Sequence, residues 1–188
     1  MIKSTIILTA LVLMTAGPLN ATNRNPSYTV NNHTDAEEAT RTVLDFLGWY
    51  KAHISSTSKI ILVNQQAGKN YSVNTKNTEQ YLAYLKSSHK LTDTYLNEWR
   101  TYFKERQAGF QLSPQHEGPP TGFEYDLVML SQDVDMQLNS LKALKINSVK
   151  VHQNRASVKF FLLEDYEFRL VCQNNHWLIN EILNLSAE

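Results

Sequence analysis

The C-terminal part of the chain constrains the fold most, because apolar and polar residues alternate there in successive short runs. Alternation with a period of two places the apolar side chains on one face of a β-strand. Short segments rich in Asn and Asp separate the runs, and these residues favour tight hairpin turns. The apolar positions are Val149, Val151; Ala156, Val158, Phe160, Leu162; Tyr166, Phe168, Leu170, Cys172; Trp177, Ile179 and Ile182. The pattern predicts an antiparallel β-meander of four strands, with the second strand central because Phe161 and Leu163 make its other face apolar too.

The N-terminal half has the spacing of helices. Thr34 and Glu37 form a capping-box pattern, which starts a helix. Apolar residues then recur every three or four positions, at Ala36, Ala39, Val43, Phe46, Leu47, Tyr50 and Ile54. This is one stripe of a long amphipathic helix. A second helix is expected to start with the pair Asn77 and Gln80, and a third at Thr92 or Asp93, with Gly109 as its C-cap.

Helices followed by a meander predict an α+β domain spanning residues 34–188, in which the helices pack on one face of the sheet. Residues 113–122 contain three prolines and two glycines, a composition that forbids regular structure. We expect an exposed loop there.

The first residues resemble a secretory signal peptide. Lys3 supplies a positive charge, a short apolar stretch follows, and Ala21 offers a cleavage position, with cleavage after Gly17 as the alternative. We therefore predict a signal peptide over residues 1–21 and a flexible leader over residues 22–33. The nearest Cys is Cys172, so a lipoprotein is not expected. The prediction is a periplasmic or secreted protein, of bacterial origin, with no stable membrane anchor after signal removal.

The composition excludes several classes of partner. The chain has 18 basic and 18 acidic side chains, whereas a nucleic-acid-binding protein usually has a basic excess. A single cysteine rules out a disulfide framework and multi-cysteine metal sites. No two histidines have the spacing of a helical metal site, so we expect neither a metal nor another cofactor. No motif of a covalent nucleophile is present either.

Two segments resemble the NTF2-like superfamily. They are Phe46-Leu47-Gly48-Trp49-Tyr50 in the first helix and the ending Asn175-His176-Trp177-Leu178-Ile179-Asn180-Glu181-Ile182. The segment Tyr125-Asp126-Leu127-Val128-Met129-Leu130-Ser131-Gln132-Asp133 is similar to one in exported bacterial members of unknown function. The resemblance implies a curved sheet around a helix, with a pocket at the open end of a cone. Because this fold carries many activities, it does not assign one.

Four residues are candidates for ligand binding: Tyr50, Trp99, Tyr125 and Asp133. Tyrosine and tryptophan at helical spacing usually belong to the core, but at a pocket mouth their polar atoms can orient an apolar ligand. Asp133 could contact a ligand, although capping of a short helix is the favoured interpretation of its position. No residue forms a recognisable catalytic arrangement.

The favoured hypothesis is a non-catalytic module that binds a small ligand or a protein partner. The first alternative is a small periplasmic enzyme that uses Asp133 or His116 for acid–base chemistry. The second is an immunity or inhibitor protein that inserts the loop of residues 113–122 into its target. A homodimer through the outer face of the sheet also remains open.

Overall fold

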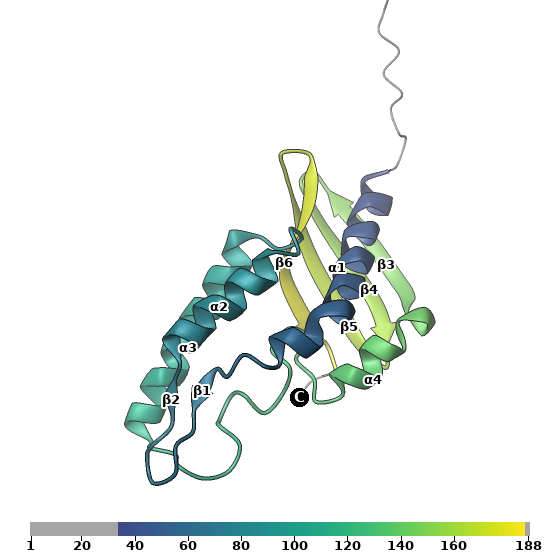
Figure 1. Cartoon of the computed structure of the whole chain (residues 1–188). Coiled ribbons are helices and arrows are strands. Elements are labelled where there is room, and N and C mark those ends of the chain that lie inside the picture. Colours follow the sequence, from purple (N-terminus) through teal and green to yellow (C-terminus); the bar gives the residue numbers. More distant parts are fainter. Residues whose placement is uncertain (1–33, 187–188) are drawn as a thin grey trace, which may run out of the picture. The chain divides into compact units, whose positions relative to one another are not determined.

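The computed structural model describes residues 34–186. The predicted signal peptide (residues 1–21) and leader (residues 22–33) lie outside the described residues. The elements are α1 (Asp35–Thr57), β1 (Val63–Asn64), β2 (Ser72–Val73), α2 (Thr75–Lys86), α3 (Asp93–Leu112), α4 (Val134–Asn139), a 3₁₀ turn η1 (Leu141–Ala143), β3 (Lys145–His152), β4 (Arg155–Leu162), β5 (Glu164–Gln173) and β6 (His176–Asn184) (Figure 1). Helices followed by an antiparallel sheet confirm the α+β class.

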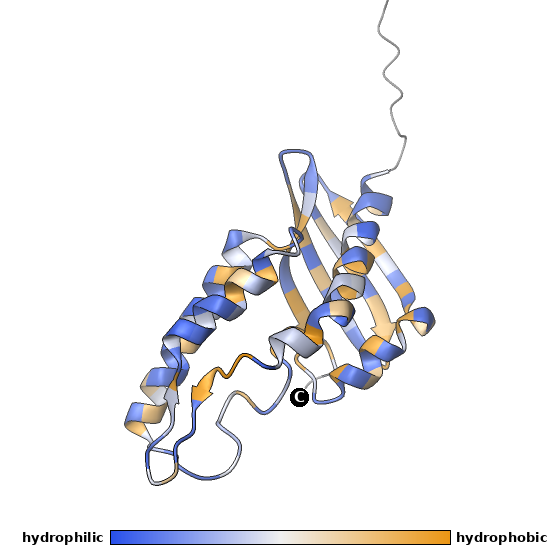
Figure 2. Cartoon of the chain, in the orientation of Figure 1, coloured by the Kyte–Doolittle hydropathy of each residue, from blue (hydrophilic) through white to orange (hydrophobic). Residues whose placement is uncertain are grey.

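The predicted meander is present, with strand order β3-β4-β5-β6 and antiparallel pairing throughout. Asn174 and Asn175 form the β5–β6 turn with φ angles of 51° and 61°. Two consecutive positive φ angles are typical of the type I′ turn, whose twist matches that of the flanking strands. The alternation of apolar and polar residues is visible along the strands in Figure 2.

Strand β4 is central, as expected, but its two faces have different surroundings. Phe160 faces the helices and has no exposed surface, whereas Phe161, on the opposite face, is 40% exposed. Around Phe161 that outer face is largely polar, and Lys159, Glu167 and Arg169 form ion pairs on it. The apolar character of Phe161 and Leu163 therefore does not mark a second buried face within the described domain.

Helix α1 lies across the inner face of the sheet and contacts β3, β4 and β6 (Figure 1). Its capping box is confirmed, since the Thr34 hydroxyl accepts the Glu37 N–H at 3.3 Å and the Glu37 carboxylate accepts the Thr34 N–H at 2.9 Å. The predicted stripe is buried at Ala39, Val43, Phe46, Leu47 and Tyr50. This stripe and the inward residues of the meander make up half of the core, and residues of β1, β2, α2, α3, α4 and their connections make up the other half.

Two helix boundaries differ from the sequence prediction. Helix α2 is capped by Asn74 rather than Asn77, because the Asn74 side chain accepts the Asn77 N–H at 3.1 Å. Helix α3 is capped by Thr92, one of the two expected positions, but continues past Gly109 to Leu112. It ends there because the next residue, Ser113, precedes Pro114 and residues before proline are disfavoured in helical conformation.

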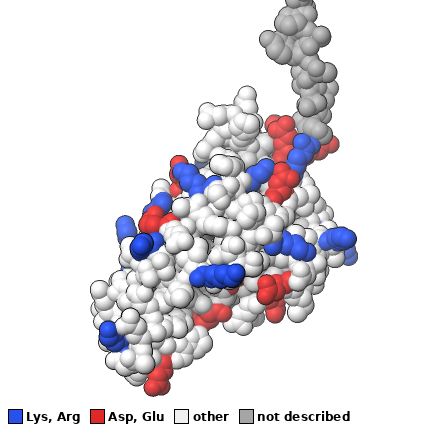
Figure 3. Space-filling model, in the orientation of Figure 1, with Lys and Arg blue, Asp and Glu red and all other residues white. Residues whose placement is uncertain are grey.

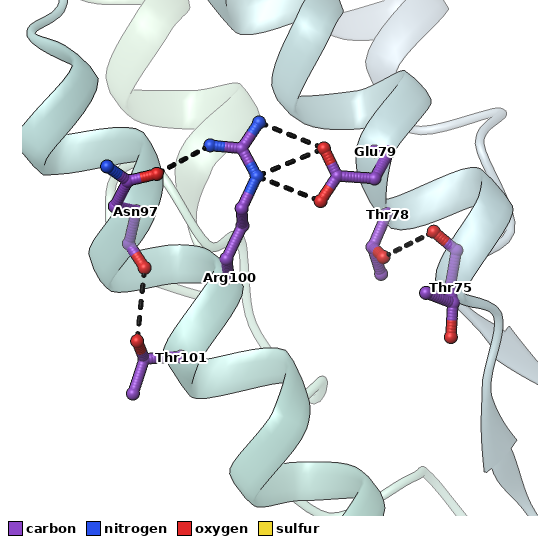
Figure 4. Close-up of polar contacts among 6 residues, drawn as sticks. All are labelled: Thr75, Thr78, Glu79, Asn97, Arg100 and Thr101. Carbon is purple, nitrogen blue, oxygen red and sulfur yellow. Dashed lines mark hydrogen bonds and ion pairs between the residues drawn. The ribbon is translucent and has the colours of Figure 1, made fainter.

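Helices α2 and α3 lie side by side and are joined by an exposed polar clamp (Figure 4). The Arg100 guanidinium donates to both carboxylate oxygens of Glu79 at 2.9 and 3.0 Å and to the Asn97 side chain at 2.7 Å. Hydrogen bonding to Arg100 lowers the pKa of Glu79. Exposed ion pairs of this kind contribute about 1 kcal/mol or less to the free energy of folding. The clamp therefore fixes the position of α2 relative to α3 more than it stabilises the fold.

The loop of residues 113–122 is present but is not a free extension. The Gln115 amide N–H group donates to the carbonyl oxygens of Glu117 and Pro119, and its side-chain oxygen accepts the Thr121 N–H. The Tyr71 N–H group also donates to the Gln115 carbonyl at 2.7 Å. These bonds fasten the loop to itself and to the β1–β2 hairpin.

No helix among the described residues is long and apolar enough to cross a membrane. On the face drawn in Figure 3, basic and acidic side chains are interspersed rather than gathered by sign.

Candidate functional site

A cavity of about 370 Å³ lies where the C-terminal end of α1 meets the segment leading to β1, helix α2 and the loop before α4. This volume is within the range of small-molecule sites. The lining residues are Tyr50, Thr57, Ser58, Ile60, Ile61, Leu62, Val63, Gln65, Tyr81, Pro120, Phe123, Tyr125, Asp126 and Leu127. Most of these side chains are apolar or aromatic, and one of them, Asp126, carries a formal charge.

Asp126 is held in the cavity wall by three donors. One carboxylate oxygen accepts the backbone N–H groups of Val128 at 3.0 Å and Met129 at 2.7 Å. The other oxygen accepts the Tyr50 hydroxyl of α1 at 2.5 Å. An aspartate that bonds to backbone N–H groups two and three residues ahead stabilises a turn. Asp126 therefore shapes its own loop and ties that loop to α1.

Burial dominates the electrostatics of this carboxyl group. Desolvation raises the pKa of Asp126, while the hydrogen bonds from Tyr50, Met129 and Val128 act in the opposite direction. Burial, followed by the fields of Tyr81 and Asp126, also raises the pKa of the Tyr50 hydroxyl. The proton between the two groups therefore stays on Tyr50, which acts as the donor.

Two further tyrosines come close to Asp126 from other helices. Tyr81 of α2 lines the cavity, and burial and the charge of Asp126 raise its pKa. Burial likewise raises the pKa of Tyr95 of α3, and Asp126 contributes to this shift. The Tyr95 hydroxyl is buried without a hydrogen-bond partner among the described residues. Phenol groups of three helices thus feel the charge of one carboxylate, and one of them, Tyr50, bonds to it directly.

A second polar network holds the Asp126 loop from the side of the sheet. The Tyr166 hydroxyl of β5 lies 3.0 Å from the Met129 carbonyl, 3.1 Å from the Gln137 side chain and 3.0 Å from Glu164. Gln137 in turn donates to Ser131 at 3.2 Å. The network joins β5, α4 and the loop that carries Asp126, so the position of the carboxylate is set by the sheet as well as by α1.

We predict that Tyr166→Phe lowers the free energy of unfolding by about 1 to 3 kcal/mol, because it leaves buried acceptors without their donor. Chemical denaturation measures this change. Ser157→Ala is the control, since its hydroxyl bonds to Glu167 on the outer face and its loss is expected to cost less. Equal losses in the two variants would contradict a buried network at Tyr166.

Another wall of the cavity depends on a close contact at Gly122. The Tyr102 hydroxyl of α3 donates to the Gly122 carbonyl at 2.6 Å and lies 3.4 Å from the Tyr125 hydroxyl. Phe123 stacks on Phe103 with ring centroids 6.1 Å apart. These contacts place Phe123 and Tyr125 along the cavity.

The structure brings two of the four predicted site residues together. Tyr50 and Tyr125 line the cavity. Trp99 lies in the aromatic packing of α3, 5.1 Å from the Tyr102 ring, and does not reach the cavity. Asp133 is exposed at the start of α4, where its side chain makes no capping hydrogen bond. The loop turns at Ser131, whose hydroxyl accepts the Asp133 N–H, and this turn leads Asp133 away from the site.

His116, the other acid–base candidate, is exposed in the loop of residues 113–122, with Nε2 3.8 Å from Glu117. It does not line the cavity. Within residues 34–186, no three His, Cys, Asp or Glu side chains are placed to hold a metal ion.

A wider hollow of about 690 Å³ follows the outer face of the sheet. Part of its charge is already paired, since Arg169 pairs with Glu167 at 3.1 Å and with Glu181 at 2.7 Å. It has no buried carboxylate in an apolar wall, so it is the weaker candidate for a specific small-molecule site.

Comparisons of the chain with protein-family models, with curated proteins and with solved structures gave no match. The geometry of the cavity is therefore the basis for any functional conclusion.

Sequence reasoning missed Asp126 and Tyr81 as site residues. Asp126 did carry a signal, because it is the one charged residue within the apolar run from Tyr125 to Leu130. A carboxylate flanked by apolar residues that become buried must itself be held by donors. Tyr81 had no such signal, since it reads as part of the apolar face of its helix.

Proposed function

We propose that the protein is a binding module for a small, largely apolar molecule, which occupies the cavity beside Asp126. The observation that carries this proposal is the convergence of Asp126, Tyr50 and Tyr81 on a cavity of about 370 Å³ whose wall is mostly apolar or aromatic. Apolar walls supply affinity by burial, and a few fixed polar groups orient the ligand. Ile61, which is 66% exposed at the cavity, gives the entering molecule an apolar rim.

The proposal also includes the NTF2-like fold and an exported location. Helix α1 across one face of a four-stranded meander, with a cavity at its C-terminal end, supports the fold. The N-terminal pattern of Lys3 followed by apolar residues supports export. Recognition through the loop of residues 113–122 is less favoured, because Gln115 fastens that loop and Pro120 forms part of the cavity wall.

We predict that small fragments bind to the purified protein and that Ser58→Trp abolishes this binding. Ser58 is exposed and lines the cavity at the end of α1, so an indole there fills the entrance without removing a core contact. The measurement is two-dimensional amide NMR with a library of aromatic and aliphatic alcohols, amides, amines and acids. Expected shifts centre on Tyr81, Phe123 and Asp126.

Ser55→Trp is the matched control, because Ser55 is exposed on the same helix but does not line the cavity. It is expected to bind the same fragments as the unmodified protein. A library without a single binder, or binding that survives Ser58→Trp, would overturn the proposed function.

A further inference from the structure

We propose that the ligand is an organic ammonium ion with an apolar body, whose charged nitrogen binds Asp126. This inference rests on the proposed function of the cavity and specifies its chemical class. It follows from three features of the wall: its charge, the unused acceptor capacity of Asp126 and the aromatic rings around it.

The charge of the cavity is uncompensated. Among the described residues that line it, none is Lys, Arg or His, and Asp126 is the single carboxylate. The groups that shift the pKa of Asp126 include another acid, Asp135, and no cation. A buried charge is costly unless it is paired. A cationic ligand would supply the missing partner, whereas an anionic ligand would add repulsion.

Asp126 retains room for a further donor. An ionised carboxylate has about four acceptor sites. Two backbone N–H groups occupy one oxygen and the Tyr50 hydroxyl occupies one site on the other. The remaining site on the second oxygen can accept an N–H group of an ammonium ion, and such charge-assisted bonds are stronger than neutral ones.

Aromatic rings provide the second element of ammonium recognition. Tyr50, Tyr81, Phe123 and Tyr125 all line the cavity that contains Asp126. Cations bind favourably over the faces of such rings, and the effect grows when the site is shielded from water. Rings together with one carboxylate favour a cation over a neutral ligand of the same shape.

The titratable groups that face Asp126 come from every neighbouring helix: Tyr50 of α1, Tyr81 of α2, Tyr95 of α3 and Asp135 of α4. The pKa values of the three tyrosines are raised, so these groups stay neutral from about pH 4 to pH 8. The three phenols therefore add no charge to the cavity over this range, and the carboxylate of Asp126 is the acidic group that the ligand meets. Because burial raises its pKa, ionisation occurs above its ordinary range near 3.8.

The test uses three probes of one shape: 2-naphthylmethylamine, 2-naphthalenemethanol and 2-naphthoic acid. Isothermal titration of the purified protein at about pH 7.5 is expected to show that the amine binds about 10-fold or more tightly than the alcohol, the gain typical of a hydrogen bond to a charged group. The acid is expected to bind least. If the alcohol or the acid equals the amine, or if no probe binds although members of the fragment library do, only the present inference fails; if neither the probes nor the library bind, the proposed function fails as well.

Asp126→Asn is expected to bring the ratio of amine to alcohol affinity close to one. Asp135→Asn is the matched control, because it removes the same charge from a residue outside the cavity wall, and its ratio is expected to stay near that of the unmodified protein. A ratio that falls equally in both variants would indicate a general effect of net charge and would overturn the inference.

The unmodified protein provides a readout that does not depend on a variant folding. The amine stays protonated between about pH 4 and pH 8, as lysine does. Its affinity is therefore expected to rise with pH as Asp126 ionises and then to level off, whereas that of the alcohol stays flat. An amine affinity that does not change with pH would contradict binding to this carboxylate.

Discussion

Phe160→Ala is expected to lower the free energy of unfolding by about 3 to 5 kcal/mol, the usual cost of truncating a buried aromatic side chain. Phe160 has no exposed surface. The centroid of its ring lies 5.1 Å from that of Phe168 and 5.4 Å from that of Tyr166. Both neighbours belong to β5, and Phe168 also contacts Phe46 of α1. The truncation therefore opens a cavity at the centre of the contact between sheet and helix. Chemical denaturation measures the loss.

The next residue on the same strand is the control. Phe161 faces away from the helices and is 40% exposed, so Phe161→Ala is expected to cost about 1 kcal/mol or less. The two substitutions remove the same side chain one position apart. Because a shift of one residue in register exchanges the faces of a strand, similar losses at both positions would contradict the described meander.

Gly122→Ala is expected to lower the free energy of unfolding by about 2 to 4 kcal/mol, through backbone strain and overpacking together. Gly122 has a φ of 88°, which L side chains rarely adopt. An added Cβ would lie 2.6 Å from the Arg106 Cδ atom and from the Tyr102 hydroxyl. The substitution also displaces the adjacent Phe123 and Tyr125, so affinity for 2-naphthylmethylamine is expected to fall.

Gly48→Ala is the comparison for this substitution. Gly48 is exposed within α1, and an added Cβ meets nothing within 4 Å. Alanine is favoured over glycine inside a helix by about 0.5 to 1 kcal/mol, so this variant is expected to be more stable. Opposite signs for the two substitutions are the predicted outcome in thermal or chemical denaturation. A harmless Gly122→Ala would mean that the wall at Tyr102 is not packed as described.

The fold was largely predictable because its signals are local. The meander follows from the alternation of inward residues such as Val158, Phe160 and Leu162, and helix α1 from its capping box and stripe. The errors are also local. Asn77 matches a capping pattern, but Asn74 supplies an acceptor one turn earlier, and Gly109 resembles a C-cap although Pro114 ends the helix.

The site was less predictable because it is assembled over long separations. Tyr50 and Asp126 are 76 residues apart in the chain and meet only when the loop before α4 folds against α1. Tyr50 and Tyr125 were predicted as pocket residues because a tyrosine combines an apolar ring with a polar hydroxyl group. Both residues line the cavity. Asp133 was predicted as a site residue and Asp126 was not, yet the buried acid between apolar neighbours is the one that lines the cavity.

A crystal structure of the protein with 2-naphthylmethylamine tests the central claim most directly. The account predicts that the naphthalene ring fills the cavity between Ile60 and Phe123 and that the nitrogen lies within hydrogen-bond distance of the free acceptor site on Asp126. Density for the probe on the outer face of the sheet, or an unchanged cavity at saturating concentration, would contradict the account.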